Sequence, residues 1–239
     1  MNQGVHPLTA TLVNQLNQVE AVSNNLANAN TNGYKEEKLT VGTFNYYLQS
    51  KTENKEPMLD TSVIMNTIPK NDTKFVNSSL GSIVPTGNDF DFALTDTNTF
   101  FKVQAPNGDV QLTRNGAFKV INDQLVDGSG LKILNDQDQP INVTTDNWYA
   151  QIGLVKSDYV NVEKIGSNNY KIVDKNKIEA VANNTENLIQ GSIEKSNVNQ
   201  IQTMVALIDA QRKFEQAQKA ITSIDDINKK VIDTVGKGQ

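Results

Sequence analysis

The chain carries few residues whose types and spacing could do chemistry. His6 is the only histidine, so no second imidazole is available to share a metal ion or to complete a catalytic triad. Asp89 and Asp91 stand two residues apart, and on a strand both carboxylates would face the same side. There they could hold a cation or act as the acid pair of a glycosidase. No second acidic cluster accompanies them, which favours surface acids or turn caps.

Two further candidates have ordinary structural interpretations. Residues 135–138 read NDQD, part of a calcium-loop pattern, but the glycine and the terminal glutamate of such a loop are missing, so we predict a turn. Trp148 and Tyr149 are expected to pack in or beside the core rather than to stack on a ligand. The chain has no cysteine, which excludes disulfides and thiolate sites. We therefore expect no catalytic residues, no metal site and no cofactor, and a protein that is not an enzyme.

Charge and hydropathy exclude several partners. The net charge is -5, and the 22 Lys and Arg residues form no basic block, so nucleic acid is not an expected partner. No stretch approaches the roughly 20 apolar residues of a membrane-spanning helix, so we expect no membrane insertion. The start of the chain lacks the basic and apolar regions of a signal peptide. If the protein leaves the cytoplasm, a route without a cleaved signal must carry it.

The two ends of the chain have the periodicity of helices. Apolar residues recur at steps of three and four over 5–27, which predicts an amphipathic helix of about six turns. Near the other end, apolar residues follow a heptad spacing from Leu207 to Val235, with Asn228 as a polar interruption. Val198, Ile201, Met204, Val205 and Ile208 lead into this series one position out of phase. Because each apolar stripe is narrow, each helix needs a helical partner, either the other end or a neighbouring chain.

The middle of the chain has the character of β structure. Short β-branched and aromatic segments alternate with turn signals such as Asn107-Gly108, Asn115-Gly116 and Asp127-Gly128. The fold class is therefore α+β, with long terminal helices that pair as a coiled coil and a central, mostly antiparallel β domain. We expect strands at 90–94, 100–104, 110–114, 118–121, 131–134, 141–144, 148–155 and 170–173.

The segment that closes the first helix carries a distinctive motif. Residues 23–35 read SNNLANANTNGYK, with five asparagines within nine residues. Asn and Gly tolerate the left-handed conformation that ends helices, so one function of the segment is a helix cap and turn. The string also closely resembles the signature of the bacterial flagellar rod and hook family, NNLAN-x-NT-x-GF/YK. The residues that carry this part of the resemblance are Asn24, Asn25, Leu26, Asn28, Asn30, Thr31, Gly33 and Tyr34.

Two other regions follow the order of the same family. Residues 191–199 (GSIEKSNVN) and 204–215 (MVALIDAQRKFE) resemble the entry to its last helix, through Ser196, Asn197 and Val198, with Ser196 as the expected N-cap. TGNDFDFAL at 86–94, FFKV at 100–103 and LTRNGAF at 112–118 resemble its β segment. The chain departs from the family at 96–99, where a Gly-x-Gly is usual, and at 122–124, where Asp-x-x-Gly is usual. The local turns at these two places are therefore expected to differ from those of the family, and the helices are expected to follow it.

The resemblance implies a structural subunit of the flagellar basal-body rod, located in the periplasmic rod and exported by the type III apparatus without a cleaved signal. The tail at 212–226 is more similar to the proximal than to the distal rod protein. The implied partners are this protein itself, other rod subunits and the export apparatus. The rod would be a hollow shaft that transmits torque. The expected assembly contacts are Leu8, Leu12, Leu16, Val19, Val22 and Leu26 against Leu207, Phe214, Ile221, Ile224, Val231 and Val235.

The expected domains are 1–35 (assembly helix and cap), 36–80 (extended connector), 81–182 (β domain) and 183–239 (connector and C-terminal helix). Three alternatives stay open at this point. The chain could be the distal rod protein, or a secreted β-domain adhesin with a helical oligomerisation stalk. A hydrolase would need a convergent polar cleft that includes Asp89 or Asp91.

Overall fold

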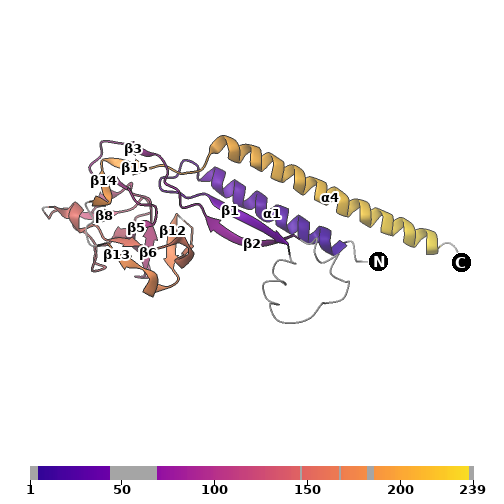
Figure 1. The fold of residues 1–239 in the computed structure, drawn as a ribbon, viewed down its shortest axis with the longest axis horizontal. Coiled ribbons are helices and arrows are strands. Elements are labelled where there is room, and N and C mark those ends of the chain that lie inside the picture. The colour runs from indigo at the N-terminus through magenta and orange to yellow at the C-terminus, as the bar shows by residue number, and fades with distance from the viewer. Residues whose placement is uncertain (1–4, 44–68, 146, 167, 182–185, 237–239) are drawn as a thin grey trace. The chain divides into compact units, whose positions relative to one another are not determined.

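The structure is a computed structural model of the 239-residue chain, and it describes residues 5–43, 69–145, 147–166, 168–181 and 186–236. The chain divides into two compact units. The first, here called the helical unit, comprises Met1–Leu26, Glu37–Lys74 and Gln200–Gln239. The second, the β unit, comprises Ala27–Glu36 and Phe75–Asn199. The predicted α+β class, with a helix at each end and antiparallel sheet between them, is confirmed (Figure 1).

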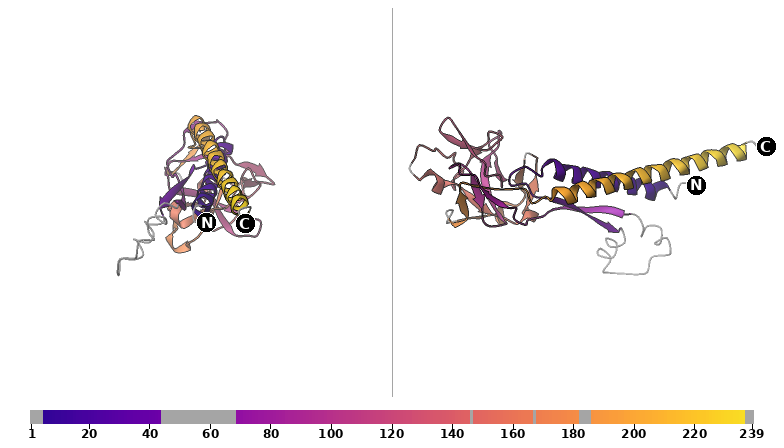
Figure 2. Two further views of the ribbon diagram at one scale, coloured as in Figure 1. Left: turned by 90° about the vertical axis from the view of Figure 1, so that its right-hand side faces the viewer. Right: turned by 90° about the horizontal axis from the view of Figure 1, so that it is seen from above.

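In its described residues, the helical unit contains two helices and a two-stranded sheet. Its elements are α1 (Val5–Ala27), β1 (Glu37–Thr43), β2 (Pro69–Val76) and α4 (Gln200–Gly236), and β1 pairs with β2. The bounds of α1 match the range predicted from periodicity. Helix α1 runs alongside α4 in the opposite direction (Figures 1 and 2). The coiled-coil pairing of the two helices stays a prediction.

The heptad face of α4 is its least exposed face. Ala210 and Ala217 are buried, and the larger residues of the series, Leu207, Phe214 and Ile221, are half-buried. Leu12 of α1 lines a shallow groove together with five α4 residues, so the two helices share a surface in this region. The α4 residues of the groove are Glu215, Gln218, Lys219, Ile221 and Thr222.

The β unit is built from short antiparallel strands. The largest sheet has the order β11-β12-β6-β5-β9-β8-β7, with β10 paired to both β5 and β13. Two small sheets, β14-β4 and β15-β3, bring the end of the β unit back against its beginning. The strands are β3 (Ile83–Pro85), β4 (Phe92–Leu94), β5 (Thr99–Gln104), β6 (Val110–Thr113), β7 (Lys119–Ile121), β8 (Gln124–Val126), β9 (Lys132–Ile133), β10 (Leu154–Lys156), β11 (Val162–Lys164), β12 (Asn169–Ile172), β13 (Glu179–Ala180), β14 (Leu188–Gln190) and β15 (Ser192–Glu194). Three 3-10 turns lie at Trp148–Gln151, Tyr159–Asn161 and Lys175–Lys177.

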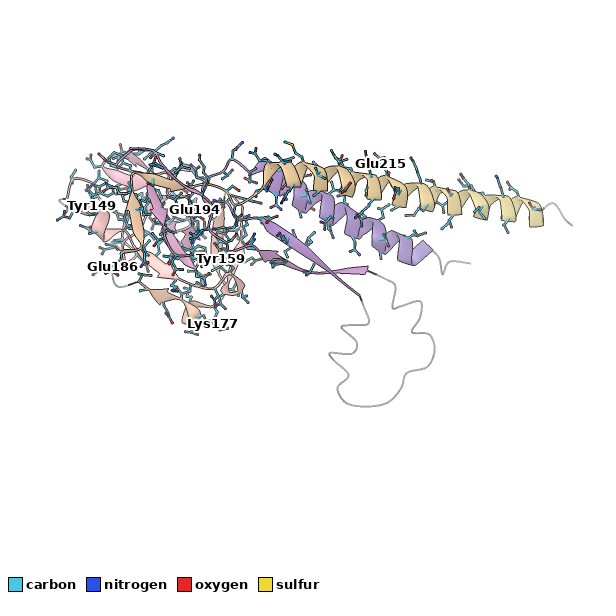
Figure 3. The ribbon with its side chains drawn as sticks, turned by 45° about the horizontal axis from the view of Figure 1, so that its top comes forward. Tyr149, Tyr159, Lys177, Glu186, Glu194 and Glu215 are labelled. Carbon is cyan, nitrogen blue, oxygen red and sulfur yellow. The ribbon has the colours of Figure 1, made fainter. Side chains whose placement is uncertain are left out.

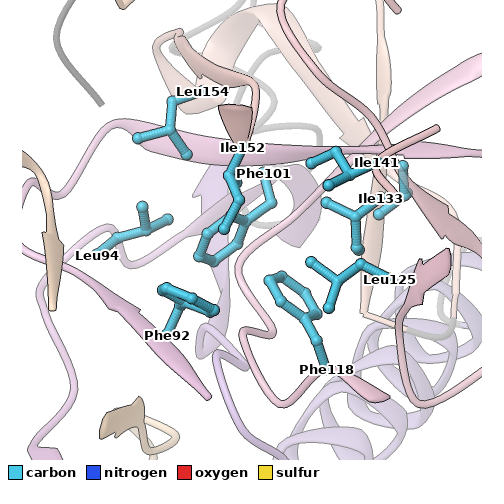
Figure 4. Packing of buried hydrophobic residues seen from close by; sticks show 10 residues of the cluster. Phe92, Leu94, Phe101, Phe118, Leu125, Ile133, Ile141, Ile152 and Leu154 are labelled. Carbon is cyan, nitrogen blue, oxygen red and sulfur yellow. The ribbon is translucent and has the colours of Figure 1, made fainter. Parts of the chain in front are cut away.

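Two apolar clusters hold the β unit together. The larger one gathers Phe92, Leu94, Val103, Leu125, Ile133, Ile141, Ile152 and Leu154 around Phe101 and Phe118, whose rings meet edge to face at 5.0 Å (Figure 4). The smaller cluster, on the other side of β5, contains Phe100, Leu112, Val155, Val162 and Tyr170. Burial of both faces explains why the β5 segment TFFKVQ lacks a clean alternation of polar and apolar residues.

Several local predictions need correction. Within 141–144 only Asn142 forms an isolated bridge, to Gln124, and no strand is present there; the expected strand at 148–155 begins as a 3-10 turn. Asn122 and Asp123 both adopt positive φ, which joins β7 to β8 through the tight turn favoured in hairpins without any glycine. Residues 188–190 of the expected second connector form β14. Residues 44–68 of the expected first connector, which include Tyr46 and Tyr47, lie outside the described residues. The domain boundaries at 35, 80 and 182 stay predictions.

Candidate functional site: a buried charge cluster where the chain ends meet

Three charged side chains from distant parts of the sequence are buried together in the β unit. Lys35 follows the asparagine-rich motif, Arg114 follows β6, and Glu194 ends β15. Their exposed fractions are 0%, 1% and 2%. Charged side chains are almost never buried this deeply unless they are paired. Figure 3 shows Glu194 within the β unit. We call Lys35, Arg114 and Glu194 the charge cluster.

Arg114 uses its whole guanidinium group. Its Nη1 atom donates to the carbonyl oxygens of Asp96, Thr97 and Thr99 at 2.9, 2.9 and 2.6 Å. Its Nε and Nη2 atoms donate to Oε2 of Glu194 at 3.0 and 2.8 Å. The turn at 96–99, where the chain departs from the family's Gly-x-Gly, therefore wraps the cation with backbone carbonyls. A planar cation with five donors in a fixed fork suits this arrangement, and lysine would not.

Glu194 is the carboxylate between the two cations. Its Oε1 atom accepts from Nζ of Lys35 at 2.6 Å and from the backbone N–H of Gly81 at 2.9 Å. Nζ of Lys35 also donates to the carbonyl oxygen of Ser79 at 2.7 Å. The carboxylate thus binds residues that precede β3, the end of β6 and the N-terminal motif. Because charge-assisted hydrogen bonds are the strongest kind available to side chains, Glu194 fixes three chain segments at one point.

Burial and neighbouring charge set the ionisation of the cluster. Burial lowers the pKa of Lys35 to about 8, and the positive charge of Arg114 adds to this shift, while Glu194 opposes it. Burial alone would raise the pKa of Glu194, but Arg114 and Lys35 outweigh it and hold that pKa below its usual range. Burial also raises the pKa of the neighbouring Tyr159 phenol. At neutral pH the cluster holds two cations and one anion.

The N-terminal motif contributes backbone to the same site. Gly33 adopts φ +68° and donates its N–H to the carbonyl oxygen of Glu194 at 2.8 Å. A Cβ atom at this position would lie 2.3 Å from the carbonyl oxygen of Arg114, so only glycine fits. Tyr34 is buried, with Nζ of Lys164 lying 3.5 Å from its ring centre. Nδ2 of Asn168 donates to the carbonyl oxygen of Asn32 at 2.9 Å.

Asn197 joins the two chain ends directly. Its Oδ1 atom accepts from the N–H of Glu36 at 2.7 Å, and its own N–H donates to the carbonyl oxygen of Tyr34 at 3.3 Å. Its Nδ2 atom donates to the carbonyl oxygens of Asn77 and Ser79 at 2.9 and 3.0 Å. Two of these hydrogen bonds hold the segment after α1 against the segment before α4, and the other two add the segment before β3 to the same junction.

The other motif residues close turns and shape the helix ends. The expectation that Ser196 caps α4 is wrong, since its Oγ accepts from the N–H of Val198 at 3.3 Å and the helix begins later, at Gln200. Val198 is buried. Asn25 exchanges two hydrogen bonds with the backbone of Glu37, at 2.7 and 2.9 Å. Oγ1 of Thr31 donates to Oδ1 of Asn28 at 3.2 Å, while Asn24 and Asn30 are exposed and Leu26 is half-buried.

The expected assembly residues on the helices differ in exposure. Val22 is buried, whereas Leu16 is half exposed and Val231 is 41% exposed. The remaining described members are half-buried: Leu8, Leu12, Val19, Leu26, Leu207, Phe214, Ile221 and Ile224. The side chain of Val235 lies outside the described residues. The structure holds one copy of the chain, so the assembly role of these residues stays a prediction.

The catalytic candidates do not come together. Asp91 is buried and accepts from Thr86 and Asn88 at 2.7 and 3.2 Å, whereas Asp89 is exposed. The run that begins at Asn135 forms the predicted turn, with its Oδ1 accepting from the N–H groups of two later residues. Trp148 packs on Phe90 at 5.5 Å, as expected of a core residue. Among the described residues, His, Asp and Glu form no group of three that could hold a metal ion. In that same part of the chain, no helix is long and apolar enough to cross a membrane.

The charge cluster was not predicted from the sequence, although its three residues lie in segments that carry the family resemblance. Lys35 ends SNNLANANTNGYK, Arg114 lies in LTRNGAF, and Glu194 lies in GSIEKSNVN. One signal in the sequence was that each of these otherwise uncharged strings contains a charged residue, although GSIEKSNVN contains two, Glu194 and Lys195. Nothing in the spacing shows that the three meet, because Lys35 and Glu194 are 159 residues apart.

Comparison with protein-family models finds three matches that cover both ends and the middle. Residues 9–35 match the model "Flagella basal body rod protein". Residues 96–167 match "Flagellar hook protein FlgE/F/G D1 domain", and residues 189–234 match "Flagellar basal body rod FlgEFG protein C-terminal". The first and last matches include Lys35 and Glu194, and the middle match includes Arg114.

Curated relatives match over most of their length. The flagellar basal-body rod protein FlgF of Caulobacter vibrioides is 28% identical, with 92% of each chain covered. The flagellar hook-basal body complex protein FlhO of Bacillus subtilis is 27% identical over 99% of this chain and 100% of its own. The flagellar basal-body rod protein FlgG of Buchnera aphidicola (Acyrthosiphon pisum) is 29% identical, with coverage of 88% and 91%.

Replacing the central carboxylate should destabilise the β unit severely. Glu194→Gln leaves Arg114 and Lys35 buried without a counter-charge, and breaking a buried pair in this way costs about 3–5 kcal/mol. Urea unfolding followed by Trp148, the only tryptophan and a β-unit residue, measures the loss. The control Glu163→Gln removes an exposed carboxylate of β11 and should change the free energy of unfolding by less than about 0.5 kcal/mol. Equal midpoints for the two variants would contradict the role given to Glu194.

Adding a methyl group at Gly33 should separate steric exclusion from backbone strain. Gly33→Ala places Cβ against the backbone of Arg114, whereas Gly87→Ala introduces the same φ penalty, at +72°, with no atom within 4 Å. We expect Gly87→Ala to cost about 1 kcal/mol and Gly33→Ala to cost roughly 2 kcal/mol more. The measurement is again urea unfolding monitored by Trp148. Similar losses in the two variants would mean that the close approach to Arg114 is relieved by a small shift.

Lys35 should make the stability of the β unit depend on alkaline pH. Because its folded pKa is about 8, the unfolded chain binds more protons above that pH, so the free energy of unfolding should rise from pH 8 towards 10. Lys35→Met should flatten this rise, which we expect to be on the order of 1–2 kcal/mol. Below about pH 4.5 both proteins should lose the stability that ionised Glu194 contributes. An identical alkaline slope in wild type and Lys35→Met would overturn the assignment.

Proposed function

We propose that this chain, which belongs to the flagellar basal-body rod protein family, is a structural subunit of the proximal part of the rod. The observation that carries the proposal is the charge cluster. It ties the motif after α1 and the motif before α4 to one point of the β unit, and the same three segments carry the family matches. The segments that follow α1 and precede α4 are thereby held together within the β unit.

The chemistry of the site supports a structural role over a catalytic one. Each polar group of the charge cluster is engaged: Arg114 makes five hydrogen bonds, and both oxygens of Glu194 accept. The partners of these hydrogen bonds all lie within the β unit. Buried networks of this kind stabilise and specify one geometry, which a load-transmitting subunit needs.

The proximal position rests on the tail of α4. Residues 212–226 resemble the proximal rod protein more than the distal one. Overall identity does not separate relatives of different names, since FlgF and FlgG match this chain at 28% and 29%. The partners in this proposal are further copies of the chain, other rod subunits and the flagellar type III export apparatus. Torque would pass through many shared helix contacts, since buried apolar area contributes about 25 cal/mol per Å² without any single strong bond.

Disrupting the seam of α4 should remove the chain from the rod. Leu207→Asp with Ile221→Asp places two charges on the half-buried heptad face, so we expect truncated rods that lack this chain in purified basal bodies. Electron microscopy measures the rods and mass spectrometry identifies the chain. The matched control, Gln211→Asp with Gln216→Asp, adds the same charge at exposed positions of α4 and should leave rods normal. Absence of the chain from wild-type basal bodies would overturn the rod assignment itself.

A further inference from the structure

Three asparagines of the β unit stand directly before a glycine, at 32–33, 107–108 and 115–116. Asparagine is a chemically unstable residue, and it is least stable when glycine follows it. Glycine has no side chain to shield its backbone nitrogen, and it leaves the backbone free to rotate. The three sites therefore share the same intrinsic chemistry, and their surroundings decide how fast each one reacts.

The reaction is deamidation. The backbone nitrogen of the glycine gives up its proton and bonds to Cγ of the asparagine, while the bond from Cγ to Nδ2 breaks and ammonia leaves with that proton. The product is a five-membered succinimide ring. Water then adds to one of the ring carbonyls and opens the ring to aspartate or isoaspartate. Because the glycine nitrogen must first turn towards Cγ, a fixed backbone slows the reaction.

The backbone around Asn32 is fixed by residues from the far end of the β unit. The N–H of Gly33 donates to the carbonyl oxygen of Glu194 at 2.8 Å. The carbonyl oxygen of Asn32 accepts from Nδ2 of Asn168 at 2.9 Å, and its side-chain oxygen accepts from Nζ of Lys195 at 3.3 Å. Turning the nitrogen of Gly33 towards Asn32 therefore requires the contact with Glu194 to open.

The backbone around Asn115 is fixed against β4. The Oδ1 atom of Asn115 accepts from the N–H of Ala117 at 3.1 Å. Gly116 is buried, and a Cβ atom there would lie 1.7 Å from the carbonyl oxygen of Phe92. The carbonyl oxygen of Gly116 also accepts from the N–H of Phe92 at 2.9 Å. Gly116 therefore has little room to rotate while β4 stays in place.

The loop that joins β5 to β6 holds Asn107 by short-range hydrogen bonds. The N–H of Gly108 donates to the carbonyl oxygen of Ala105 at 2.9 Å. The Nδ2 atom of Asn107 donates to Oδ2 of Asp109 at 2.6 Å, and its Oδ1 accepts from the N–H of Asp109 at 3.2 Å. Residues 106–109 are exposed, and a Cβ atom at Gly108 would meet no heavy atom within 4 Å. Opening residues 105–109 at the surface is thus enough to free the nitrogen of Gly108.

We infer that Asn107 is a site of deamidation in the folded protein, and that Asn32 and Asn115 convert when the β unit opens. Opening an exposed loop requires less free energy than separating strands and buried contacts. The product carries a carboxylate at the place where the Asn107 amide donates to Asp109, so two anions repel each other there. Deamidation therefore loosens the loop and adds one negative charge to a chain whose net charge is -5. The inference does not depend on the proposed rod function.

Peptide mapping by mass spectrometry tests this assignment. The purified full-length chain is incubated in mildly alkaline buffer, folded in one sample and unfolded by urea in the other, and the deamidated fraction at each site is followed with time. In the folded chain we expect Asn107 to convert at least about tenfold faster than Asn32 and Asn115. In urea the three rates should become similar, since glycine follows each asparagine.

Sequence variants separate the chemistry of each site from its protection. Gly108→Ala shields the attacking nitrogen, so it should slow the conversion of Asn107 in the folded and in the unfolded chain. Glu194→Gln weakens the contact that holds Gly33, so it should accelerate the conversion of Asn32 more than that of Asn107. The matched control Glu163→Gln removes an exposed carboxylate and should leave both rates unchanged.

Two results in the folded wild-type chain would overturn the inference. Conversion of Asn32 or Asn115 as fast as that of Asn107 would mean that the buried contacts give no protection. An Asn107 that converts in urea but stays intact in the folded chain would mean that the hydrogen bonds within residues 105–109 are sufficient to block the attack.

Discussion

The ion pairs of Glu194 are the interaction on which the rest of the structure depends. One carboxylate from the second half of the sequence neutralises two cations from the first half, at 2.6 Å from Lys35 and 2.8 Å from Arg114. Burying three charges has a desolvation cost of several kcal/mol per ion, and an apolar cluster of equal volume could be as stable. The charges add a geometric requirement, because their hydrogen bonds are directional. Guanidinium, carboxylate and ammonium groups fit together in one arrangement, so the motif after α1 and the motif before α4 must meet in one register.

The backbone geometry at this junction also allows only one register of the two motifs. Gly33 passes so close to Arg114 that a Cβ atom cannot fit, and at Gly116, two residues after Arg114, a Cβ atom would lie only 1.7 Å from the carbonyl oxygen of Phe92. Asn197 then satisfies backbone groups on both sides of the junction, and Asn77 donates two hydrogen bonds to Glu36, one from its backbone N–H and one from Nδ2. The abundance of asparagine in the family motif is thereby explained, because a short amide side chain can both donate and accept next to irregular backbone.

The sequence predicted the parts of this molecule that depend on local pattern. The helix at 5–27, the apolar strands around Phe101 and the turn at Asn135 follow from periodicity and side-chain chemistry that neighbouring residues share. Contacts between residues that are far apart in the sequence could not be predicted from it. Strands β14 and β15 are three residues each and are defined by pairing with β4 and β3, about a hundred residues earlier. The charge cluster has the same character, since no spacing links Lys35 to Glu194. The family resemblance located the motifs but not the charged residues that hold them together.

The helices cannot satisfy each other within one chain, and two dimensions of α4 show why. Around the helix, a single antiparallel partner covers one stripe, so the face of Ile201 and Ile208 stays open while the face of Ala210 is buried. Along the helix, α4 has 37 residues and α1 has 23, so α4 exceeds its partner by about 20 Å at 1.5 Å per residue. In the distal half of α4, Ile227 is 60% exposed, and Val231, which belongs to the heptad series, is 41% exposed. A helix with apolar residues on two faces and beyond the end of its partner is suited to an assembly in which neighbouring chains supply the missing surfaces. The charge cluster has the complementary property, since all its partners lie within one chain. In the proposed assembly, rigidity within the subunit and adhesion between subunits would be carried by different chemistry, charge-assisted hydrogen bonds in the β unit and apolar stripes on the helices.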